Sequence, residues 1–279
     1  MRATSERIEV KSADQMRLMR KAGLVVADAL DAVRAAVAPG VSTLELDGIA
    51  EQVIRAAGAV PSFLGYGRPP YPATTCISVN DEVVHGIPGA RMLRAGDVLS
   101  VDCGAILAGW HGDAAFSTVV APDEAPDADP ADAELVAVTE QSMWRGIAAI
   151  AEGNRLVDIG AAVEDFVDGR FGIVEEYGGH GIGTQMHQPP HVLNYRTRAR
   201  GPKLKPGICL AIEPMLTMGE PDTRVQPDEW TVVTADGSRA AHWEHSVALT
   251  ERGPWVLTAR DGGEGALAAL GVRFAPLAD

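Results

Sequence analysis

Carboxylates occur inside apolar, strand-like segments of this chain, where charged side chains are uncommon. Asp102 and Asp113 are 11 positions apart and symmetric about Leu107-Ala108, the centre of an expected β-hairpin. That symmetry predicts that they lie directly opposite each other on one face of a sheet, with Cβ atoms roughly 5 Å apart. Two like charges so close either raise one pKa strongly, as in an acid–base pair, or are neutralised by a cation between them.

Two more acids and a histidine favour the cation. Glu213 ends one strand-like run and Glu244 begins another. His180 lies within Gly178–Gly183, where glycines let the backbone approach a ligand closely. Taken singly, each acid would more often be a surface residue, and a lone histidine in such a turn is seldom a ligand. Four carboxylates and one imidazole together suit a pair of Mn, Fe, Co or Zn ions, so the residues predict a dinuclear metal site.

The composition restricts the class of protein. The chain has 279 residues, 46% hydrophobic and 22% charged, which is typical of a globular protein. Its formal charge of −14 argues against nucleic-acid binding, which needs clustered Lys and Arg. No apolar leader begins the chain and no stretch approaches the roughly 18 apolar residues of a membrane span, so we expect a cytoplasmic protein without membrane contact. Cys76, Cys103 and Cys209 lack C-x-x-C spacing and are expected to be reduced thiols.

Two halves of the chain resemble each other. Leu93–Asp102 aligns with Leu204–Glu213, each ending in a carboxylate, and Ala38–Glu51 aligns with Ala151–Glu164 at nearly the same offset. Chance is the alternative, because a turn glycine before an apolar strand is a common local solution. We interpret the repeat as a single catalytic domain over residues 1–279, with pseudo-twofold halves at about 12–121 and 131–257 joined by an acidic connector, 122–134.

Hydrophobic periodicity supplies the elements that must position these side chains. Capping boxes at Ser12 and Ser42 predict two helices in the first half, and apolar spacing predicts two more in the second, the third running from Leu135 towards Gly153. Strands are expected at 76–79, 98–103, 114–120, 208–212, 231–234 and 244–249. The predicted fold class is α+β, with helices covering a curved antiparallel sheet.

Five segments of the chain resemble the type I methionine aminopeptidases, which have the pita-bread fold. They are CISVNDEVVHGIP at 76–88, GDVLSVDCGA through Asp113, GHGIGTQMHQPP at 179–190, IEPM at 212–215 and EHSVALT at 244–250. The resemblance covers about residues 8–257. It implies a ligand set for two divalent ions (Co, Mn, Fe or Zn) made of Asp102, Asp113, His180, Glu213 and Glu244, with Asp113 and Glu244 bridging.

The resemblance also implies a reaction, removal of an N-terminal methionine when the second residue is small. His85 and His187 correspond to the two histidines that contact the substrate without binding metal, and Glu213 to the residue that moves the proton. The implied partners are N-termini of nascent polypeptides, with transient ribosome proximity, for a monomeric enzyme. Asn80 corresponds to a monovalent cation site of some relatives.

The side chains that correspond to the methionine pocket are mostly aromatic. They are Phe63, Tyr66, Tyr71, Cys76, Met186 and Trp230. Core packing is the alternative for the aromatic ones. The chain departs from the family pattern by extra residues at 67–70 and by Phe63, Val84, Met186 and Gln188. His111, His191 and His242 have no role in the motifs, and His245 is expected to support Glu244.

Three other interpretations remain as alternatives. A proline-specific aminopeptidase or prolidase of the same fold would normally carry an additional N-terminal domain. A type II methionine aminopeptidase would carry an insertion between Glu213 and Glu244, for which there is no room. A non-catalytic relative that binds proteins would have lost ligands, whereas all five are present here.

Overall fold

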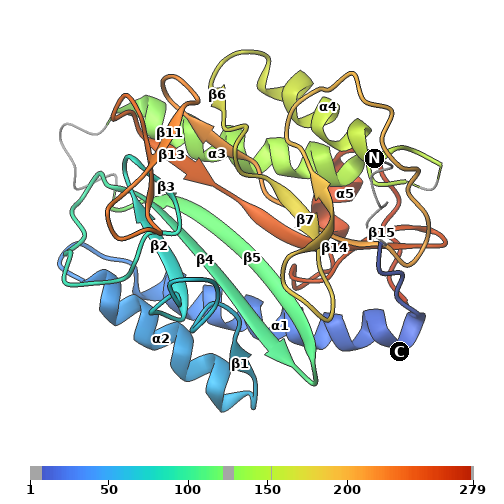
Figure 1. Ribbon diagram of the computed structural model, residues 1–279, viewed down its shortest axis with the longest axis horizontal. Helices are drawn as coiled ribbons and strands as arrows, with labels where there is room; N and C mark the ends of the chain where they lie inside the picture. The colour runs from blue at the N-terminus through green and yellow to red at the C-terminus, as the bar shows by residue number, and fades with distance from the viewer. Residues whose placement is uncertain (1–7, 122–128, 152, 278–279) are drawn as a thin grey trace.

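The computed structural model describes residues 8–121, 129–151 and 153–277 (Figure 1). Its helices are α1 (Ala13–Ala36), α2 (Thr43–Ala56), α3 (Pro130–Ala148), α4 (Leu156–Val167) and the short α5 (Glu264–Ala269). Both predicted capping boxes are present, Ser12 with Gln15 and Ser42 with Glu45. None of the helices in the described part of the chain combines the length and apolar character that crossing a membrane requires.

The acidic connector is shorter than predicted. Helix α3 begins at Pro130, so residues 130–134 are helical, whereas 122–128 lie outside the described residues. Asp129 accepts a hydrogen bond from the backbone N–H of Ala131 at 2.9 Å, and proline at the first helical position has no N–H to leave unpaired. Residues 130–134, which were predicted as part of a solvated linker, therefore form the first turn of α3. The helix ends at Ala148 and does not reach Gly153.

Nine strands in the described residues form one antiparallel sheet with the path β1-β4-β5-β14-β9-β7-β8; β2 pairs with β4, and β15 with β14. Their bounds are β1 Val60–Pro61, β2 Thr75–Val79, β4 Val98–Leu107, β5 Trp110–Val119, β7 Gly179–Gly181, β8 Gln188–Val192, β9 Cys209–Ile212, β14 Glu244–Thr250 and β15 Gly253–Val256. Two three-stranded sheets flank it, β13-β10-β6 (Ala240–His242, Met215–Thr217, Gly172–Ile173) and β11-β12-β3 (Thr223–Val225, Val232–Thr234, Glu82–Val84).

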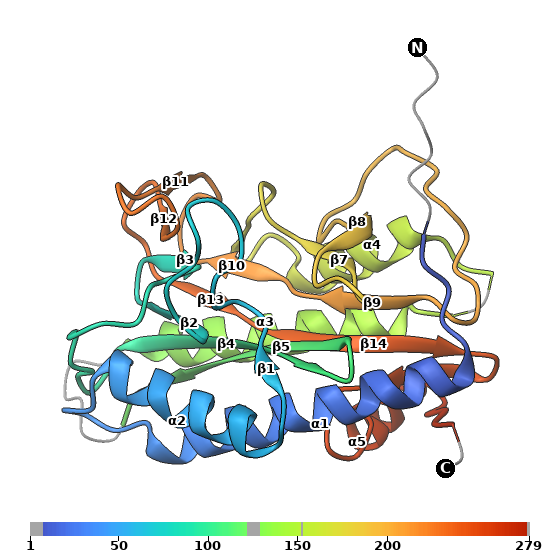
Figure 2. The ribbon, with the colours of Figure 1, turned by 60° about the horizontal axis from the view of Figure 1, so that its bottom comes forward.

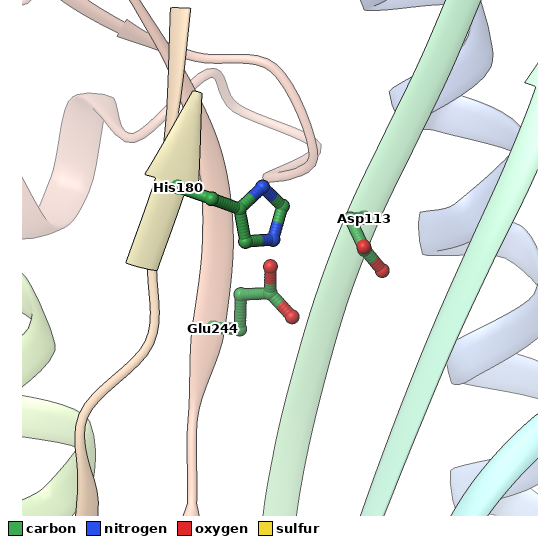
Figure 3. A group of neighbouring side chains, drawn as sticks. All are labelled: Asp113, His180 and Glu244. Atoms are coloured by element: carbon green, nitrogen blue, oxygen red, sulfur yellow. The ribbon is translucent and has the colours of Figure 1, made fainter. Parts of the chain in front are cut away.

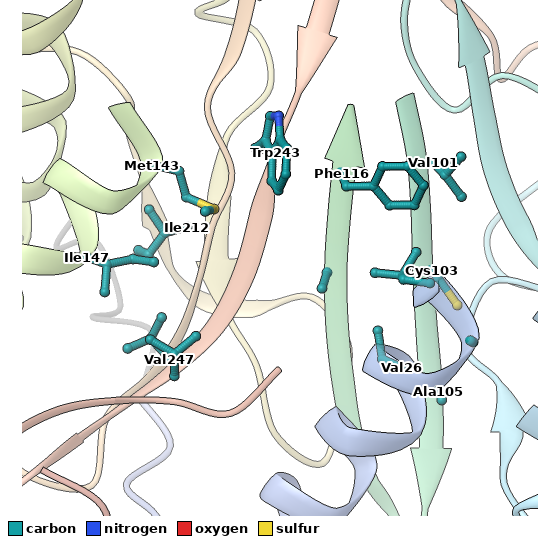
Figure 4. Close-up of a cluster of buried hydrophobic side chains, with 14 of the residues drawn as sticks. Val26, Val101, Cys103, Ala105, Phe116, Met143, Ile147, Ile212, Trp243 and Val247 are labelled. Atoms are coloured by element: carbon teal, nitrogen blue, oxygen red, sulfur yellow. The ribbon is translucent and has the colours of Figure 1, made fainter. Parts of the chain in front are cut away.

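Alternation along the central strands gives the main sheet two different faces. Val101 and Cys103 of β4, with Phe116 of β5, point into the main apolar core, which also contains Val26 of α1 and Met143 of α3 (Figure 4). The alternate residues, Asp102 among them, point to the opposite face. The long helices α1 and α2 cover one side of the sheet, and β3, β11 and β12 rise on the other (Figure 2).

The predicted hairpin exists, but its register differs from the prediction. The turn is Ala108-Gly109, both with positive φ (52° and 81°), so Leu107 pairs with Trp110. Asp102 therefore lies opposite Ala115, and Asp113 opposite Gly104. A two-residue turn of this kind matches the twist of the strands, which explains why the chain reverses one residue later than expected. The two acids remain on one face as diagonal neighbours, and direct opposition was wrong.

Candidate metal centre

Adjacent strands of the main sheet bring the acids together. Asp102 lies on β4 and Asp113 on β5; Glu244 begins β14, and Glu213 directly follows β9. In the sheet, β5 and β14 are neighbours at the centre and β4 and β9 flank them, so each half of the repeat contributes two acids. Glu244 pairs with Ala115, a small residue that leaves space above the strand.

His180 approaches the same space from β7, which pairs with β9. Figure 3 shows its ring directed towards Glu244, with Asp113 on the neighbouring strand. Ligand atoms of Asp113, His180 and Glu244 lie within 4.8 Å of one another. His180 Nε2 is also 3.3 Å from Glu213 Oε1, while its Nδ1 faces the Gly181 carbonyl at 3.1 Å.

A second group of possible ligand atoms adjoins the first and shares Glu244. It consists of Glu213, His242 and Glu244, again within 4.8 Å of one another. Glu213 Oε2 lies 3.6 Å from His242 Nε2. Two overlapping groups with a common carboxylate suit two neighbouring cations.

Several oxygen atoms in this cluster are buried without any hydrogen-bond partner. They are Asp102 Oδ1, Asp113 Oδ1 and Glu244 Oε1. Leaving a carboxylate oxygen buried and unpaired costs several kcal/mol, so the folded protein is expected to supply a partner. A divalent cation is the partner that suits carboxylate oxygens and an imidazole, and the residues present therefore fit a metal.

The electrostatics of the protein alone oppose ionisation of these acids. Burial raises the pKa of Asp113, Glu213 and Glu244 well above the usual range. For Asp102 burial raises the pKa to about 7, a rise that His242 reduces and Glu213 increases. Burial lowers the pKa of His180 to about 3, so its imidazole is neutral and free to bind a cation. A bound cation would reverse the preference of the acids, because it stabilises their charged forms.

A cavity of about 170 Å³ opens beside the acids. All the residues predicted for metal binding, catalysis and substrate binding line it, and Val84 and His242 line it as well. Sequence reasoning missed His242, which is 2% exposed on β13. Its position two residues before Glu244 was a usable signal, since side chains two apart in extended backbone share a face.

The far wall of the cavity is apolar. Phe63, Tyr71, Cys76 and Met186 form a buried cluster on which Trp230 packs. Tyr71 Oη lies 3.0 Å from the Thr75 carbonyl and 2.9 Å from that of Gly86, and Trp230 Nε1 donates to the Pro69 carbonyl at 3.1 Å. These bonds satisfy the polar atoms of the rings and leave their apolar surfaces for a ligand.

The two histidines predicted to contact substrate lie where the acidic and apolar walls meet. His187 has its ring centroid 4.3 Å from that of His180, and its Nδ1 is 2.8 Å from Oη of the exposed Tyr66. His85 packs edge-on to Trp230, with 6.0 Å between centroids, and burial lowers its pKa to about 4. Burial also lowers the pKa of His187, so both rings are neutral hydrogen-bonding groups.

The remaining histidines and Asn80 lie outside the cavity. His111 is buried with Nδ1 3.0 Å from Ser62 Oγ, and His191 is exposed. His245 lies against Trp144 and has Nδ1 2.8 Å from Thr258 Oγ1, on the helix side of the sheet, so the prediction that it supports Glu244 was wrong. Both polar atoms of the Asn80 amide are hydrogen-bonded within the protein. Its Nδ2 donates to Asp97 at 2.9 Å, and its Oδ1 accepts from the Val98 N–H at 3.0 Å.

Comparisons with known proteins agree on one family. The model of metallopeptidase family M24 matches residues 17–251. Methionine aminopeptidase 1 of Mycobacterium tuberculosis is 55% identical over 89% of this chain and 94% of its own length, and the methionine aminopeptidase of Clostridium acetobutylicum is 45% identical over 90% and 98%. The crystal structure of methionine aminopeptidase from Thermotoga maritima, 38% identical, superposes with a TM-score of 0.86 over 91% of this chain and 100% of its own. The pita-bread fold predicted by resemblance is confirmed.

Proposed function

The chain belongs to metallopeptidase family M24 and to the methionine aminopeptidases within it, and we propose that it removes the N-terminal methionine of polypeptides whose second residue is small. One observation carries the proposal: buried, unpartnered carboxylate oxygens lie next to an apolar cavity. The first feature suits a hydrolytic metal centre, and the second suits a methionine side chain. The relatives' names do not favour the proline-specific alternative.

We assign two divalent ions to five ligands, namely Asp102, Asp113, His180, Glu213 and Glu244. Asp113 and Glu244 would be shared between the ions; Glu244 belongs to both groups of neighbouring ligand atoms, and Asp113 to one of them. When bound, ions of this type (Co, Mn, Fe or Zn) supply Lewis-acid chemistry, in which they polarise a carbonyl and lower the pKa of water.

The chain's own residues then orient the substrate and move a proton. The apolar wall accepts the methionine side chain, and the acidic side, Asp102 in particular, attracts the free α-ammonium group. His85 and His187, both neutral, donate hydrogen bonds to the substrate amide and its developing oxyanion. Glu213 accepts the proton of the attacking water and delivers it to the leaving amine, a role supported by its position in the wall of the cavity beside His180.

The setting of the enzyme follows from this substrate. The proposed substrates are polypeptides that still carry their N-terminal methionine, so we propose a cytoplasmic monomer that works in transient proximity to the ribosome. The pseudo-twofold halves are proposed to form one catalytic domain, since each half contributes two of the acids. A monovalent cation near Asn80 stays a proposal, and the amide of Asn80 is already hydrogen-bonded to Asp97 and Val98.

Metal removal and replacement test the proposal directly. The protein is stripped with a chelator and supplied with Mn, Co, Fe or Zn, and methionine release from Met-Ala-Ser is followed beside an Ala-Pro-Ser control. We expect no release from the stripped protein, recovery with at least one ion, and little cleavage of the proline peptide. Failure of every ion to restore methionine release, or preferential cleavage of the proline peptide, would contradict the proposed function.

A further inference from the structure

A buried lysine precedes the first helix and contacts none of the acids of the metal centre. The Lys11 side chain is 1% exposed, and its backbone N–H donates to the Gly207 carbonyl at 2.8 Å. Its ammonium group donates to the Glu9 carbonyl at 3.3 Å and lies 3.7 Å from Glu9 Oε1. Burying an ammonium group costs free energy even when a carboxylate lies nearby. We therefore expect the buried Lys11 ammonium group and its partner Glu9 to have a role in the protein.

The pair is connected to the loop between β7 and β8. Thr184 Oγ1 donates to Glu9 Oε2 at 2.7 Å. With its amide oxygen oriented towards Lys11, Gln188 accepts from Lys11 Nζ at 2.9 Å and donates to Glu9 Oε2 at 3.0 Å. Gly183 completes the contact, because a Cβ there would lie 2.5 Å from Lys11 Cε. Both ends of the loop therefore contact Glu9 and Lys11.

This loop carries two residues of the cavity. Met186 and His187 lie between the anchoring residues Thr184 and Gln188, and both line the cavity. The His187 ring packs against His180 and Tyr66. It is hydrogen-bonded to Tyr66, an exposed residue on another loop. The position of the His187 ring therefore depends on how firmly its own loop is held. Displacing a catalytic group by about 1 Å can cost on the order of 100-fold in rate.

We propose that Glu9 and Lys11 are positioning residues that fix the loop Gly183–Gln188 and thereby aim His187 and Met186 into the cavity. Neither residue lines the cavity, so they act through the loop and not on the substrate. The inference rests on the proposed function for the role of His187. The bracing itself rests only on the hydrogen bonds and on the burial of the Lys11 side chain.

A double-mutant cycle tests whether Lys11 acts through His187. Lys11→Met keeps the length and apolar stem of the side chain but removes the charge, and Lys21→Met is the matched control at an exposed lysine. With Met-Ala-Ser and saturating metal, we expect kcat/KM to fall about tenfold in Lys11→Met, mainly through kcat, and to stay unchanged in Lys21→Met. In a His187→Ala background, Lys11→Met should cost little more. Equal losses in both backgrounds, or a lower Tm with unchanged kcat and KM, would overturn the proposal.

Hydrogen exchange provides a readout that does not require activity. In metal-free protein, the amides of residues 183–188 should exchange faster in Lys11→Met than in the wild type or Lys21→Met. If Lys11→Met does not yield folded protein, Glu9→Gln takes its place, because it removes the charge but keeps the shape. Unchanged exchange in the loop would refute the bracing. A wild-type protein that releases no methionine would refute the proposed function instead, and the exchange result would still decide on the loop.

Discussion

At Glu244 the requirements of folding and of metal binding oppose each other. The side chain is buried, and burial together with the charge of Asp113 raises its pKa well above the usual range. A carboxyl whose pKa is higher in the folded than in the unfolded state favours folding at low pH, and this contribution is lost as pH rises through the folded pKa. At neutral pH the metal-free protein therefore carries an unfavourable acid at this position.

Replacing this acid should stabilise the metal-free protein and remove its response to metal. We expect Glu244→Gln to raise the metal-free Tm at pH 7.5 by a few degrees, about 2–4 °C for each kcal/mol gained, and to abolish most of the Tm increase caused by Mn. Glu251→Gln, at an exposed position near the end of β14, serves as the control. Thermal unfolding with chelator or Mn measures both effects. A lower metal-free Tm with the Mn response intact would contradict this account of Glu244.

His111 gives a separate pH dependence, because it lies outside the metal cluster. Burial lowers its pKa from 6.5 to about 4, so the folded protein holds it neutral. Its contribution is present above pH 6.5 and is lost as pH falls from 6.5 towards 4, by at most about 3 kcal/mol. Denaturant unfolding of metal-free protein between pH 7.5 and 5 should show a smaller loss of stability in His111→Gln than in the wild type. Parallel pH profiles would show that this histidine does not titrate with folding.

At the scale of elements, the main strands and helices were predictable and the hairpin register was not. Apolar runs bounded by glycine and proline indicated β4, β5 and β14, and the capping boxes located α1 and α2. The predicted strands 98–103 and 114–120 were too short, because β4 runs on to Leu107 and β5 begins at Trp110. The hairpin register depends on which two residues adopt positive φ. Ala108 is one of them, and alanine gives no sign in the sequence that it adopts this conformation. The contact of Glu9 with Thr184 has no signature in the sequence either, because 175 positions separate the partners.

Gly104 links the hairpin register to the metal centre. It lies opposite Asp113, and a Cβ there would be 3.1 Å from Asp113 Oδ1 and 2.8 Å from the Cβ of Ser62. We expect Gly104→Ala to displace the Asp113 carboxylate and weaken metal affinity about 10–100-fold, as measured by calorimetric titration of Mn. Gly48→Ala is the matched control, because a Cβ at this helical position meets nothing within 4 Å. Unchanged Mn affinity in Gly104→Ala would show that the opposing strand has room for a side chain.

At the scale of the whole molecule, the site exists because the two halves meet at the centre of one sheet. Asp102 and Asp113 come from one half, and Glu213 and Glu244 from the other, so neither half holds a complete set. The carboxylate pattern was legible in the sequence because each acid lies within an apolar strand-like run or at one end of it. His242 was missed although its place two residues before Glu244 was a usable signal, because it lies on a separate short strand and belongs to no recognised motif.

The most direct test of this account is anomalous diffraction at the Mn edge from crystals grown with excess manganese. We predict two peaks a few ångströms apart, enclosed by Asp102, Asp113, His180, Glu213 and Glu244, with Asp113 and Glu244 contacting both. An empty space between these five side chains, or manganese bound only elsewhere on the molecule, would contradict the central claim.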